Sequence, residues 1–251
     1  METSSRRRNS NIVLALDFLE SHKEKLLRKS LNLLEELSEL ICAVKINRHL
    51  VLPLGLFDGV TKIVDRIHDL EIPVIMDCKI NDISSTNLVI AENYFKAGFD
   101  GITVNPTVGW EDGLKPVFKL AHRLSKGIIT VVYMSHKGAQ EFYEQKILEG
   151  VGKHSFQYEV FARKTLEWQA DGAVVGATKP DKIQEINKIL GGKVPIYSPG
   201  VGFQGGKIEE ALISGAKFLI VGRTIINSKK PVEVTERIRE TVLKTLKKIS
   251  G

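Results

Sequence analysis

The sequence predicts a single α/β domain, a (β/α)8 TIM barrel, and three observations support this expectation. Short apolar segments rich in valine and isoleucine alternate with amphipathic segments along the whole chain. Eight such pairs fit into 251 residues, close to the roughly 250 residues typical of this barrel. No Pro-, Gly- or Ser-rich linker and no shift in composition divides the chain. An open doubly wound sheet is the alternative, but it would need fewer units or a second domain.

Eight segments are expected to be strands because they are nearly continuous apolar runs, the pattern of parallel strands that are covered on both faces. These segments are residues 12–18, 43–47, 74–79, 101–105, 128–134, 173–177, 194–198 and 218–222. Apolar residues at helical spacing predict helices over residues 25–40, 57–70, 84–97, 113–124, 155–169, 180–190, 206–214 and 232–249. The longest insertion, residues 135–154, follows the fifth strand, at the end of the barrel where working loops lie.

The composition is that of a soluble globular protein, with 43% hydrophobic and 26% charged residues. No apolar run reaches the roughly 18 residues of a membrane span, and the polar start of the chain predicts no export signal. We expect residues 1–10 to form a flexible basic tail and residues 11–251 to form the barrel. Cys42 and Cys78 lack metal-type spacing and indicate a reducing compartment, so we expect a cytoplasmic protein with no membrane partner.

The net charge of +6 raises the question of a nucleic-acid ligand. Residues 1–8 carry a net charge of +2 and residues 229–251 a net charge of +4, so residues 9–228 are neutral. Basic ends can hold polyanions loosely, whereas a nucleic-acid site needs a basic platform. We therefore expect no nucleic-acid partner, and we interpret the basic ends as solvated.

Polar residues stand at the ends of most of the predicted strands. Such side chains are costly inside a buried strand but acceptable at its carboxyl end, where the active sites of barrels form. Because these ends meet at one mouth, we expect the side chains to converge there. They are Asp17, Lys45, Asp77, Lys79, Ser135, Ser198 and Arg223.

The densest group of charges is in the segment from Asp77 to Asp82. Residues i and i+2 of a strand share a face, so Asp77 and Lys79 are expected to point into the mouth and Cys78 toward the helices. Lys45 comes from the neighbouring strand, and Asp82 lies just beyond the strand end. Four charges of alternating sign can then meet in one pocket, where pKa values are tuned for catalysis. The alternative is a buried ion-pair network that serves only the fold.

Two segments near the end of the chain predict a phosphate site. Residues 198–206 are rich in glycine and lie between the seventh strand and the next helix, where backbone N–H groups can surround an anion. Gly222 and Arg223 end the eighth strand, and a guanidinium binds phosphate with two parallel hydrogen bonds. Barrels often hold a phosphate in these two loops. The six histidines form no ligand motif, and no cofactor signature is present, so we expect neither a metal nor a cofactor.

Taken in order, these motifs resemble those of the orotidine 5′-phosphate decarboxylase family. They are Val44-Lys45-Ile46, Asp77-x-Lys79-x-x-Asp82-Ile83-x-x-Thr86, Met134-Ser135-His136, the glycine-rich residues 198–206, and Gly222-Arg223. The Asp-x-Lys-x-x-Asp element is also similar to that of Mg²⁺-dependent sugar-phosphate decarboxylases and aldolases of the same barrel superfamily. Those enzymes tend to carry a carboxylate where Lys45 stands, so they are the alternative.

The resemblance implies cofactor-free decarboxylation of orotidine 5′-monophosphate (OMP) to UMP and CO₂ in pyrimidine biosynthesis. It implies a catalytic array of Lys45, Asp77, Lys79 and Asp82, with Lys79 as the proton donor to C6. It also implies a homodimer in which Asp82 and Thr86 serve the partner's site. The resemblance implies that Asp17 and Lys45 bind the ribose and that Ser135 binds the pyrimidine. The loop from Pro199 to Gln204 is expected to close over the substrate, and the phosphate is expected to contact Gln204, the Gly222 amide and Arg223. Ile83 is also expected to be a substrate-binding residue.

Some residues depart from the family pattern. Asn105 and Pro106 stand where relatives often carry a histidine, Asn47 where glycine is frequent, and Phe203 where a smaller residue is common. These departures concern the ribose and loop contacts and leave the four charges intact. A third hypothesis is a barrel that binds a phosphoribosyl ligand without turnover, and the intact charges argue against it.

Overall fold

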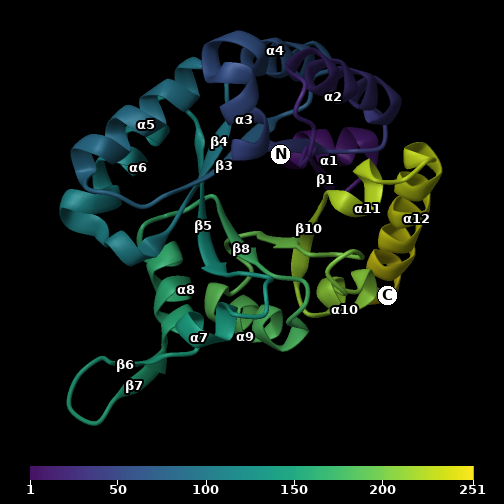
Figure 1. Ribbon diagram of the computed structural model, residues 1–251. Helices are drawn as coiled ribbons and strands as arrows, with labels where there is room; N and C mark the ends of the chain where they lie inside the picture. The colour runs from purple at the N-terminus through teal and green to yellow at the C-terminus, as the bar shows by residue number, and fades with distance from the viewer. Residues whose placement is uncertain (251) are drawn as a thin grey trace.

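The computed structural model describes the backbone of residues 1–250 and the side chains of residues 1–249. Within this range eight parallel strands close into a barrel in the order β1-β10-β9-β8-β5-β4-β3-β2 (Figure 1). The expected (β/α)8 barrel is therefore confirmed. Its strands are β1 (Ile12–Ala15), β2 (Ala43–Ile46), β3 (Val74–Ile80), β4 (Gly101–Val104), β5 (Gly127–Tyr133), β8 (Gly172–Val175), β9 (Ile196–Pro199) and β10 (Ala216–Val221).

Each expected strand overlaps an observed one, and the largest difference is at the carboxyl end of β1. The sequence predicts a strand to residue 18, but β1 ends at Ala15. The backbone N–H of Leu16 still bonds to the neighbouring strand at Lys45, whereas that of Asp17 turns back to the carbonyl oxygen of Ala15. This tight turn lifts the Asp17 carboxylate to the rim of the barrel.

The helices form an outer ring around the barrel, and α12 packs against α2 and α10 to close it (Figure 1). Pro180 begins α9 and Gly191, at φ 58°, ends it, as expected of a residue that fixes φ and one that tolerates the left-handed region. The apolar periodicity of the sequence does not predict the short helices α3 and α11, which follow β2 and β10 at the mouth. The helices of the ring are α2 (Lys23–Leu37), α3 (Arg48–Leu54), α4 (Thr61–Asp69), α5 (Ser84–Lys96), α6 (Lys115–Arg123), α8 (Gln157–Glu167), α9 (Pro180–Leu190), α10 (Ile208–Ile213), α11 (Arg223–Ile226) and α12 (Pro231–Ser250), with wider or tighter turns at Gly55–Val60, Pro106–Val108 and Trp110–Leu114.

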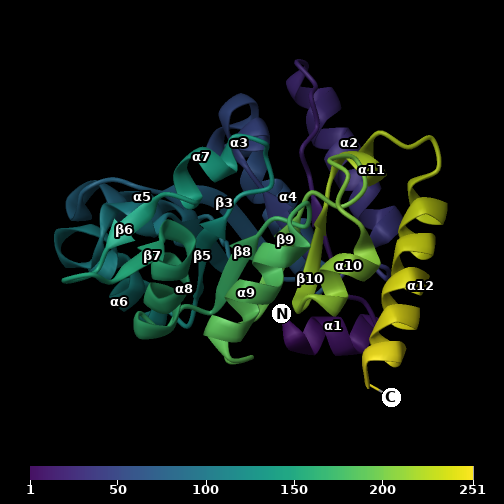
Figure 2. The ribbon, with the colours of Figure 1, turned by 90° about the horizontal axis from the view of Figure 1, so that it is seen from below.

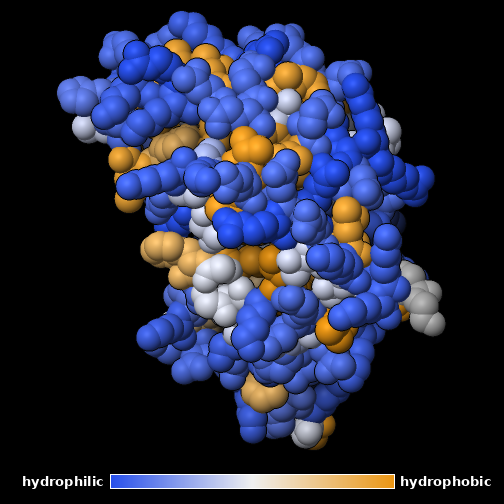
Figure 3. Space-filling view, turned by 90° about the vertical axis from the view of Figure 1, so that its right-hand side faces the viewer, coloured by the Kyte–Doolittle hydropathy of each residue, from blue (hydrophilic) through white to orange (hydrophobic). Residues whose placement is uncertain are grey.

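The basic residues at the end of the chain lie on α12. Thr235, Ile238, Val242 and Thr245 form its buried stripe at helical spacing, and the lysines of residues 244–248 are exposed. The face of the molecule on which α12 lies is mostly hydrophilic, with scattered hydrophobic side chains (Figure 3). No helix in the described part of the chain combines the length and apolarity that a membrane span requires.

The insertion after β5 contains a short helix, α7 (Ala139–Tyr143), and an antiparallel hairpin of β6 (Lys146–Leu148) and β7 (His154–Phe156). The hairpin projects away from the barrel (Figure 1). The insertion extends to Phe156, two residues beyond the predicted end, so α8 begins at Gln157 and not at residue 155. Most of the insertion points outward, and only its first residues reach the mouth.

The start of the chain differs from the predicted flexible tail, because Glu2–Arg8 form helix α1. Figure 2 shows α1 at one end of the barrel and α3, α7 and α11 at the opposite end. Arg8 is 4% exposed, and its guanidinium donates to the carbonyl oxygens of Ser38, Leu70 and Glu71. These oxygens follow the ends of α2 and α4, where a cation is favoured. The segment is therefore ordered by capping two helices.

Replacing Arg8 by alanine should lower the free energy of unfolding by about 2–4 kcal/mol, because carbonyl groups at two helix ends lose a buried charged donor. Urea denaturation checks this value. Arg7→Ala is the matched control, since Arg7 forms an exposed ion pair with Glu71 whose loss costs about 1 kcal/mol or less. Equal losses in the two variants would contradict the capping role of Arg8.

Candidate active site

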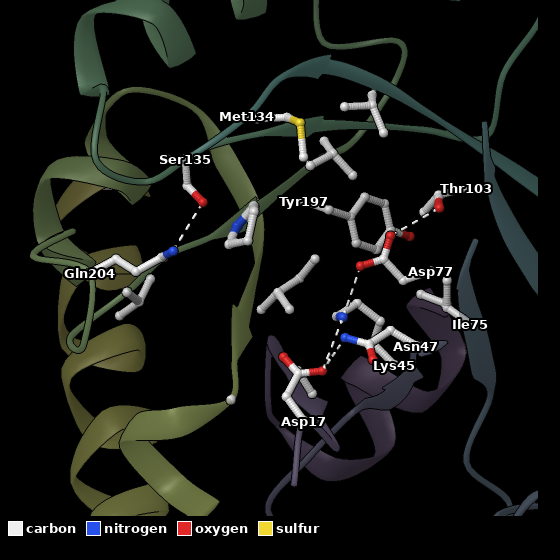
Figure 4. A pocket seen from close by; sticks show the side chains of 18 of the residues that line it. Asp17, Lys45, Asn47, Ile75, Asp77, Thr103, Met134, Ser135, Tyr197 and Gln204 are labelled. Atoms are coloured by element: carbon white, nitrogen blue, oxygen red, sulfur yellow. Dashed lines mark hydrogen bonds and ion pairs between the residues drawn. The ribbon is translucent and has the colours of Figure 1, made fainter. Parts of the chain in front are cut away.

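A pocket opens at the end of the barrel where the strands end, and nine of the predicted site residues line it (Figure 4). They are Asp17, Lys45, Asp77, Lys79, Ser135, Pro199, Gln204, Gly222 and Arg223. Tyr197 lines both this pocket and a cavity at the opposite end of the barrel, and therefore lies between the two. Its ring stacks on Phe218 with centroids 4.8 Å apart. Gly172 leaves the space for the ring, because a Cβ there would lie 2.6 Å from it.

Three of the four residues of the expected catalytic array, Lys45, Asp77 and Lys79, meet in this pocket, and Asp17 joins them. The Lys45 Nζ lies 2.9 Å from Asp77 Oδ2 and 3.6 Å from Asp17 Oδ1. The Lys79 Nζ donates to Asp77 Oδ1 at 2.6 Å. The Asp77 carboxylate is thus bound between two ammonium groups, and Figure 4 shows its contact with Lys45 from the adjacent strand.

Burial and charge act in opposite directions on these groups. Burial alone raises the pKa of Asp77, but the charges of Lys45 and Lys79 outweigh it and hold the pKa well below its ordinary value. Burial alone lowers the pKa of Lys45, but Asp77 and Asp17 outweigh it and raise the pKa above its ordinary value. Asp77 and Lys45 therefore remain charged at neutral pH although both side chains are mostly buried.

The backbone at Lys79 is unusual. Lys79 has φ 49°, in the left-handed region that costs a non-glycine residue about 1–3 kcal/mol. The pairing of β3 with β4 shifts register between Met76 and Ile80, and the Lys79 N–H donates to Thr103 Oγ1 at 2.9 Å. As predicted, Asp77 and Lys79 both face the pocket and Cys78 is buried away from it. A local distortion, rather than a regular strand, produces this arrangement at Lys79.

Thr103 also lines the pocket, although the sequence motifs do not point to it. Its hydroxyl donates to Asp77 Oδ1 at 3.0 Å while it accepts from the Lys79 N–H. It therefore orients both residues of the array. The available signal was a hydroxyl inside an otherwise apolar strand next to the one that carries Asp77 and Lys79.

Asn47 was noted only as a departure from the family pattern, yet it lines the pocket. Its Nδ2 donates to Asp17 Oδ1 at 2.6 Å, and its Oδ1 accepts from the N–H of His49 at 2.7 Å. The first contact fixes the Asp17 carboxylate, and the second caps the start of α3. Asn47 therefore ties the rim of the pocket to the helix that follows β2.

The glycine-rich segment after β9 bends over the opposite side of the pocket. The Ser135 hydroxyl donates to Gln204 Oε1 at 3.0 Å and so joins this segment to the end of β5 (Figure 4). Gly202, at φ 73°, has no room for a side chain, since a Cβ would lie 2.6 Å from Thr224 Oγ1. The segment is therefore packed closely onto the residue that follows Arg223.

Asp82, Ile83 and Thr86 lie outside the pocket of their own chain and are exposed. The side chain of Asn87 is buried and holds the Asp82 backbone: its Oδ1 accepts from the Asp82 N–H at 2.9 Å, and its amide bonds to the Asp82 carbonyl oxygen. The Asp82 carboxylate accepts from the N–H of Ile83. The expectation that four charges meet within one chain thus differs from the structure, because this loop turns outward at Asp82.

The other candidate groups do not enter the pocket. His136 is exposed and does not line it. Burial raises the pKa of the Cys42 and Cys78 thiols to about 12, so both are protonated at neutral pH. Within residues 1–249, no three His, Cys, Asp or Glu side chains lie close enough together to hold a metal ion.

A (β/α)8 barrel with a lysine–carboxylate array at the carboxyl ends of its strands defines a class, the barrel enzymes that act on small molecules in this mouth. The sequence profile of the orotidine 5′-phosphate decarboxylase / HUMPS family matches residues 10–238, and the chain belongs to this family. The resemblance inferred from the motifs is confirmed, and the chain is a carboxy-lyase.

Individual relatives agree with this assignment. The orotidine 5′-phosphate decarboxylase of Methanosarcina mazei is 35% identical over 237 residues, which cover 94% of this chain and 96% of the relative. That of Methanosarcina barkeri is 36% identical over 231 residues, covering 92% and 94%. The crystal structure of the Methanocaldococcus jannaschii enzyme, complexed with the inhibitor BMP, superimposes with a TM-score of 0.78 at 32% identity and covers 93% of this chain and 98% of that one.

The pKa of Asp77 predicts how its contribution to stability depends on pH. Because the folded-state pKa lies below the ordinary value of 3.8, this contribution is fully present well above pH 3.8 and is lost as the pH falls through the folded-state pKa. Asp77→Asn should lower the free energy of unfolding by about 2–4 kcal/mol at pH 7, since Lys45 and Lys79 then lose their shared partner.

Urea denaturation from pH 7 down to pH 3 should show this difference shrinking below about pH 4. Glu111→Gln is the control, because Glu111 forms an exposed pair with Lys115 and its loss changes stability by about 1 kcal/mol or less. A difference between Asp77→Asn and the unchanged protein that stays constant down to pH 3 would contradict the lowered pKa.

Proposed function

We propose that this chain converts OMP to UMP and CO₂ without a cofactor, as a step of pyrimidine biosynthesis in the cytoplasm. The observation that carries the proposal is the Asp77 carboxylate between Lys45 and Lys79, in a pocket whose other side offers Gln204, Gly222 and Arg223. Such a site offers cations for a developing negative charge at one end and donors for a phosphate at the other. The buried thiols of Cys42 and Cys78 fit the reducing compartment.

In this mechanism the bond between C6 and the carboxylate of OMP breaks and CO₂ leaves. The electron pair of that bond remains on C6. The Lys79 ammonium lies close to this carbon and donates a proton to it, which gives UMP. Water returns a proton to the lysine amine. The positive charge of Lys79 stabilises the developing carbanion before the transfer.

Asp77 lies near the substrate carboxylate in this arrangement. Two carboxylates at close range raise the energy of the bound substrate, and departure of neutral CO₂ removes the repulsion. Asp77 cannot relieve it by taking up a proton, since Lys45 and Lys79 hold its pKa low. Lys45 and Asp17, with Asn47 behind them, bind the ribose hydroxyls, and Ser135 binds the pyrimidine ring.

The alternative is a Mg²⁺-dependent lyase of sugar phosphates, which belongs to the same superfamily. Mg²⁺ in such a site requires oxygen ligands. Here the ammonium of Lys45 lies between the carboxylates of Asp17 and Asp77, and it supplies the positive charge at that position. This contact favours the cofactor-free reaction.

Lys79→Ala should reduce the rate of OMP decarboxylation by about 10³-fold or more, because it removes both the proton donor and the cation beside C6. The change in absorbance as OMP is consumed measures the rate, with and without EDTA. The variant should still bind UMP, since the phosphate and ribose contacts remain. Lys115→Ala, which removes a half-buried lysine of α6 that pairs with Glu111 outside the pocket, is the control and should keep full activity.

Turnover that survives in Lys79→Ala would contradict its role as proton donor. Turnover of the unchanged protein that disappears with EDTA and returns with Mg²⁺ would instead support the sugar-phosphate lyase, as would turnover of a keto-acid sugar phosphate and not of OMP.

A homodimer completes the site in this proposal, with Asp82 and Thr86 of one copy reaching the pocket of the other. Both residues are exposed and lie outside the pocket of their own chain. Leu52 on α3, Val89 on α5 and Ile83 directly before α5 are also exposed to solvent. These helices follow the neighbouring strands β2 and β3. An apolar surface beside a carboxylate that its own chain does not use fits a contact between two copies.

Mixing subunits tests the shared site. Asp82→Ala and Lys79→Ala subunits, each nearly inactive alone, should form mixed dimers in which one site carries both changes and the other carries none. Random pairing should recover about a quarter of the activity of the unchanged protein. Asp77→Asn mixed with Lys79→Ala is the control and should recover nothing, because both residues belong to the same chain's site. No recovery in demonstrated Asp82→Ala/Lys79→Ala dimers would contradict sharing.

A further inference from the structure

Phe203 stands beside the proposed phosphate site and has no role in the mechanism above. It lies in the glycine-rich segment after β9, lines the pocket and is 61% exposed. Its ring lies over the guanidinium of Arg223, with 4.1 Å between the ring centroid and Arg223 Cζ. This distance is that of a cation–π contact.

The backbone holds Phe203 in this position. The Phe203 N–H donates to Thr224 Oγ1 at 3.0 Å, and that hydroxyl donates to the carbonyl oxygen of Val201 at 3.2 Å. Thr224 directly follows Arg223 in the chain. The segment that carries the ring is therefore hydrogen-bonded to the residue next to Arg223, and this bond keeps the ring and the guanidinium close together.

Arg223 has no other partner in the described part of the chain. Within residues 1–249, no carboxylate lies within ion-pair distance of its guanidinium, and its N–H groups make no hydrogen bond. An exposed arginine side chain without a partner has many rotamers, and binding a ligand with it requires ordering them. Among the described residues, the contact with Phe203 is thus the interaction that orients the cation at the pocket.

The geometry of the contact leaves the binding groups of Arg223 free. The five N–H donors of a guanidinium lie in its plane, whereas the ring of Phe203 covers one face. An anion can therefore bind at the edge while the ring remains in place. Gln204, which follows Phe203 in the chain, is hydrogen-bonded to Ser135 at the same pocket. The side chains of Gln204 and Arg223 can therefore bind the same ligand.

We propose that Phe203 is a positioning residue of the phosphate site, which acts by stacking on Arg223 and holding its guanidinium in the pocket before the ligand arrives. The identity of the ligand as a phosphate monoester rests on the proposed function. Phe203 also lines the pocket. An orientation that exists before binding removes part of the cost of ordering the arginine, so Phe203 contributes to affinity through its contact with Arg223. An exposed cation–π contact of this kind corresponds to about a 2- to 5-fold change in binding.

Binding of UMP, uridine and ribose 5-phosphate by titration calorimetry tests the proposal. Phe203→Ala should weaken UMP and ribose 5-phosphate by about 2- to 5-fold and leave uridine, which has no phosphate, unchanged. Phe203→Tyr should keep the affinity of the unchanged protein, and Phe203→Leu should resemble Phe203→Ala, because leucine is apolar but has no π face. Phe142→Ala, which removes an exposed ring on α7, is the control.

A double-mutant cycle with Arg223→Ala separates the contact from a general effect on the loop. Phe203→Ala should have no further effect on UMP binding in the Arg223→Ala background. An equal loss in both backgrounds, an equal loss for uridine, or full affinity in Phe203→Leu would overturn the proposal.

The same measurements distinguish this inference from the proposed reaction. Ribose 5-phosphate carries the phosphate without the base, so it reports on Phe203 and Arg223 even if the unchanged protein fails to decarboxylate OMP. If the unchanged protein decarboxylates OMP but Phe203→Ala binds both phosphorylated ligands with unaltered affinity, the role of Phe203 is refuted and the proposed reaction is not. In the decarboxylation assay the expected effect of Phe203→Ala is a rise in KM of the same size, with kcat retained.

Discussion

Asp77 accepts hydrogen bonds from Lys45, Lys79 and Thr103 at once, and because its side chain is mostly buried each of these contacts depends on the others. Without the two ammonium groups a buried carboxylate would take up a proton, and without the carboxylate the lysines would repel each other. The array is therefore stable only as a unit. The two lysines come from neighbouring strands, so the closed barrel is the structure that brings them to one carboxylate.

The barrel separates the strained and charged candidate site from the parts of the molecule that stabilise the fold. At the mouth, Lys79 has a left-handed backbone, glycines allow close packing of the segment after β9, and Arg223 has no counter-charge of its own within the described residues. At the opposite end, α1 caps two helices through Arg8, and Lys126 forms an ion pair with Asp100. This division is typical of barrels, in which the carboxyl ends of the strands carry function and the other end carries stability.

Two residues that depart from the family pattern have defined contacts at the mouth. Asn47 donates a hydrogen bond that fixes the Asp17 carboxylate, and Phe203 covers one face of the Arg223 guanidinium. Neither residue carries the charge that reacts, and both act on a charged group that contacts the ligand in the proposed mechanism. A contact of this kind fixes the orientation of the group that binds the ligand. A group that is already oriented contributes more to the binding free energy than one that must first be ordered.

The sequence alone was sufficient for the fold class and for most of the site, because apolar periodicity identifies buried parallel strands and their carboxyl ends must share one mouth. Asp17, Lys45, Asp77 and Lys79 could be placed by this rule without coordinates. The tertiary structure alone decided the contacts that join distant segments: Thr103 on Asp77, Asn47 on Asp17, Arg8 on the ends of α2 and α4, and the outward turn at Asp82 that Asn87 holds. Periodicity reports which face of an element is buried, whereas a hydrogen bond between two segments depends on distances that exist only once the chain has folded.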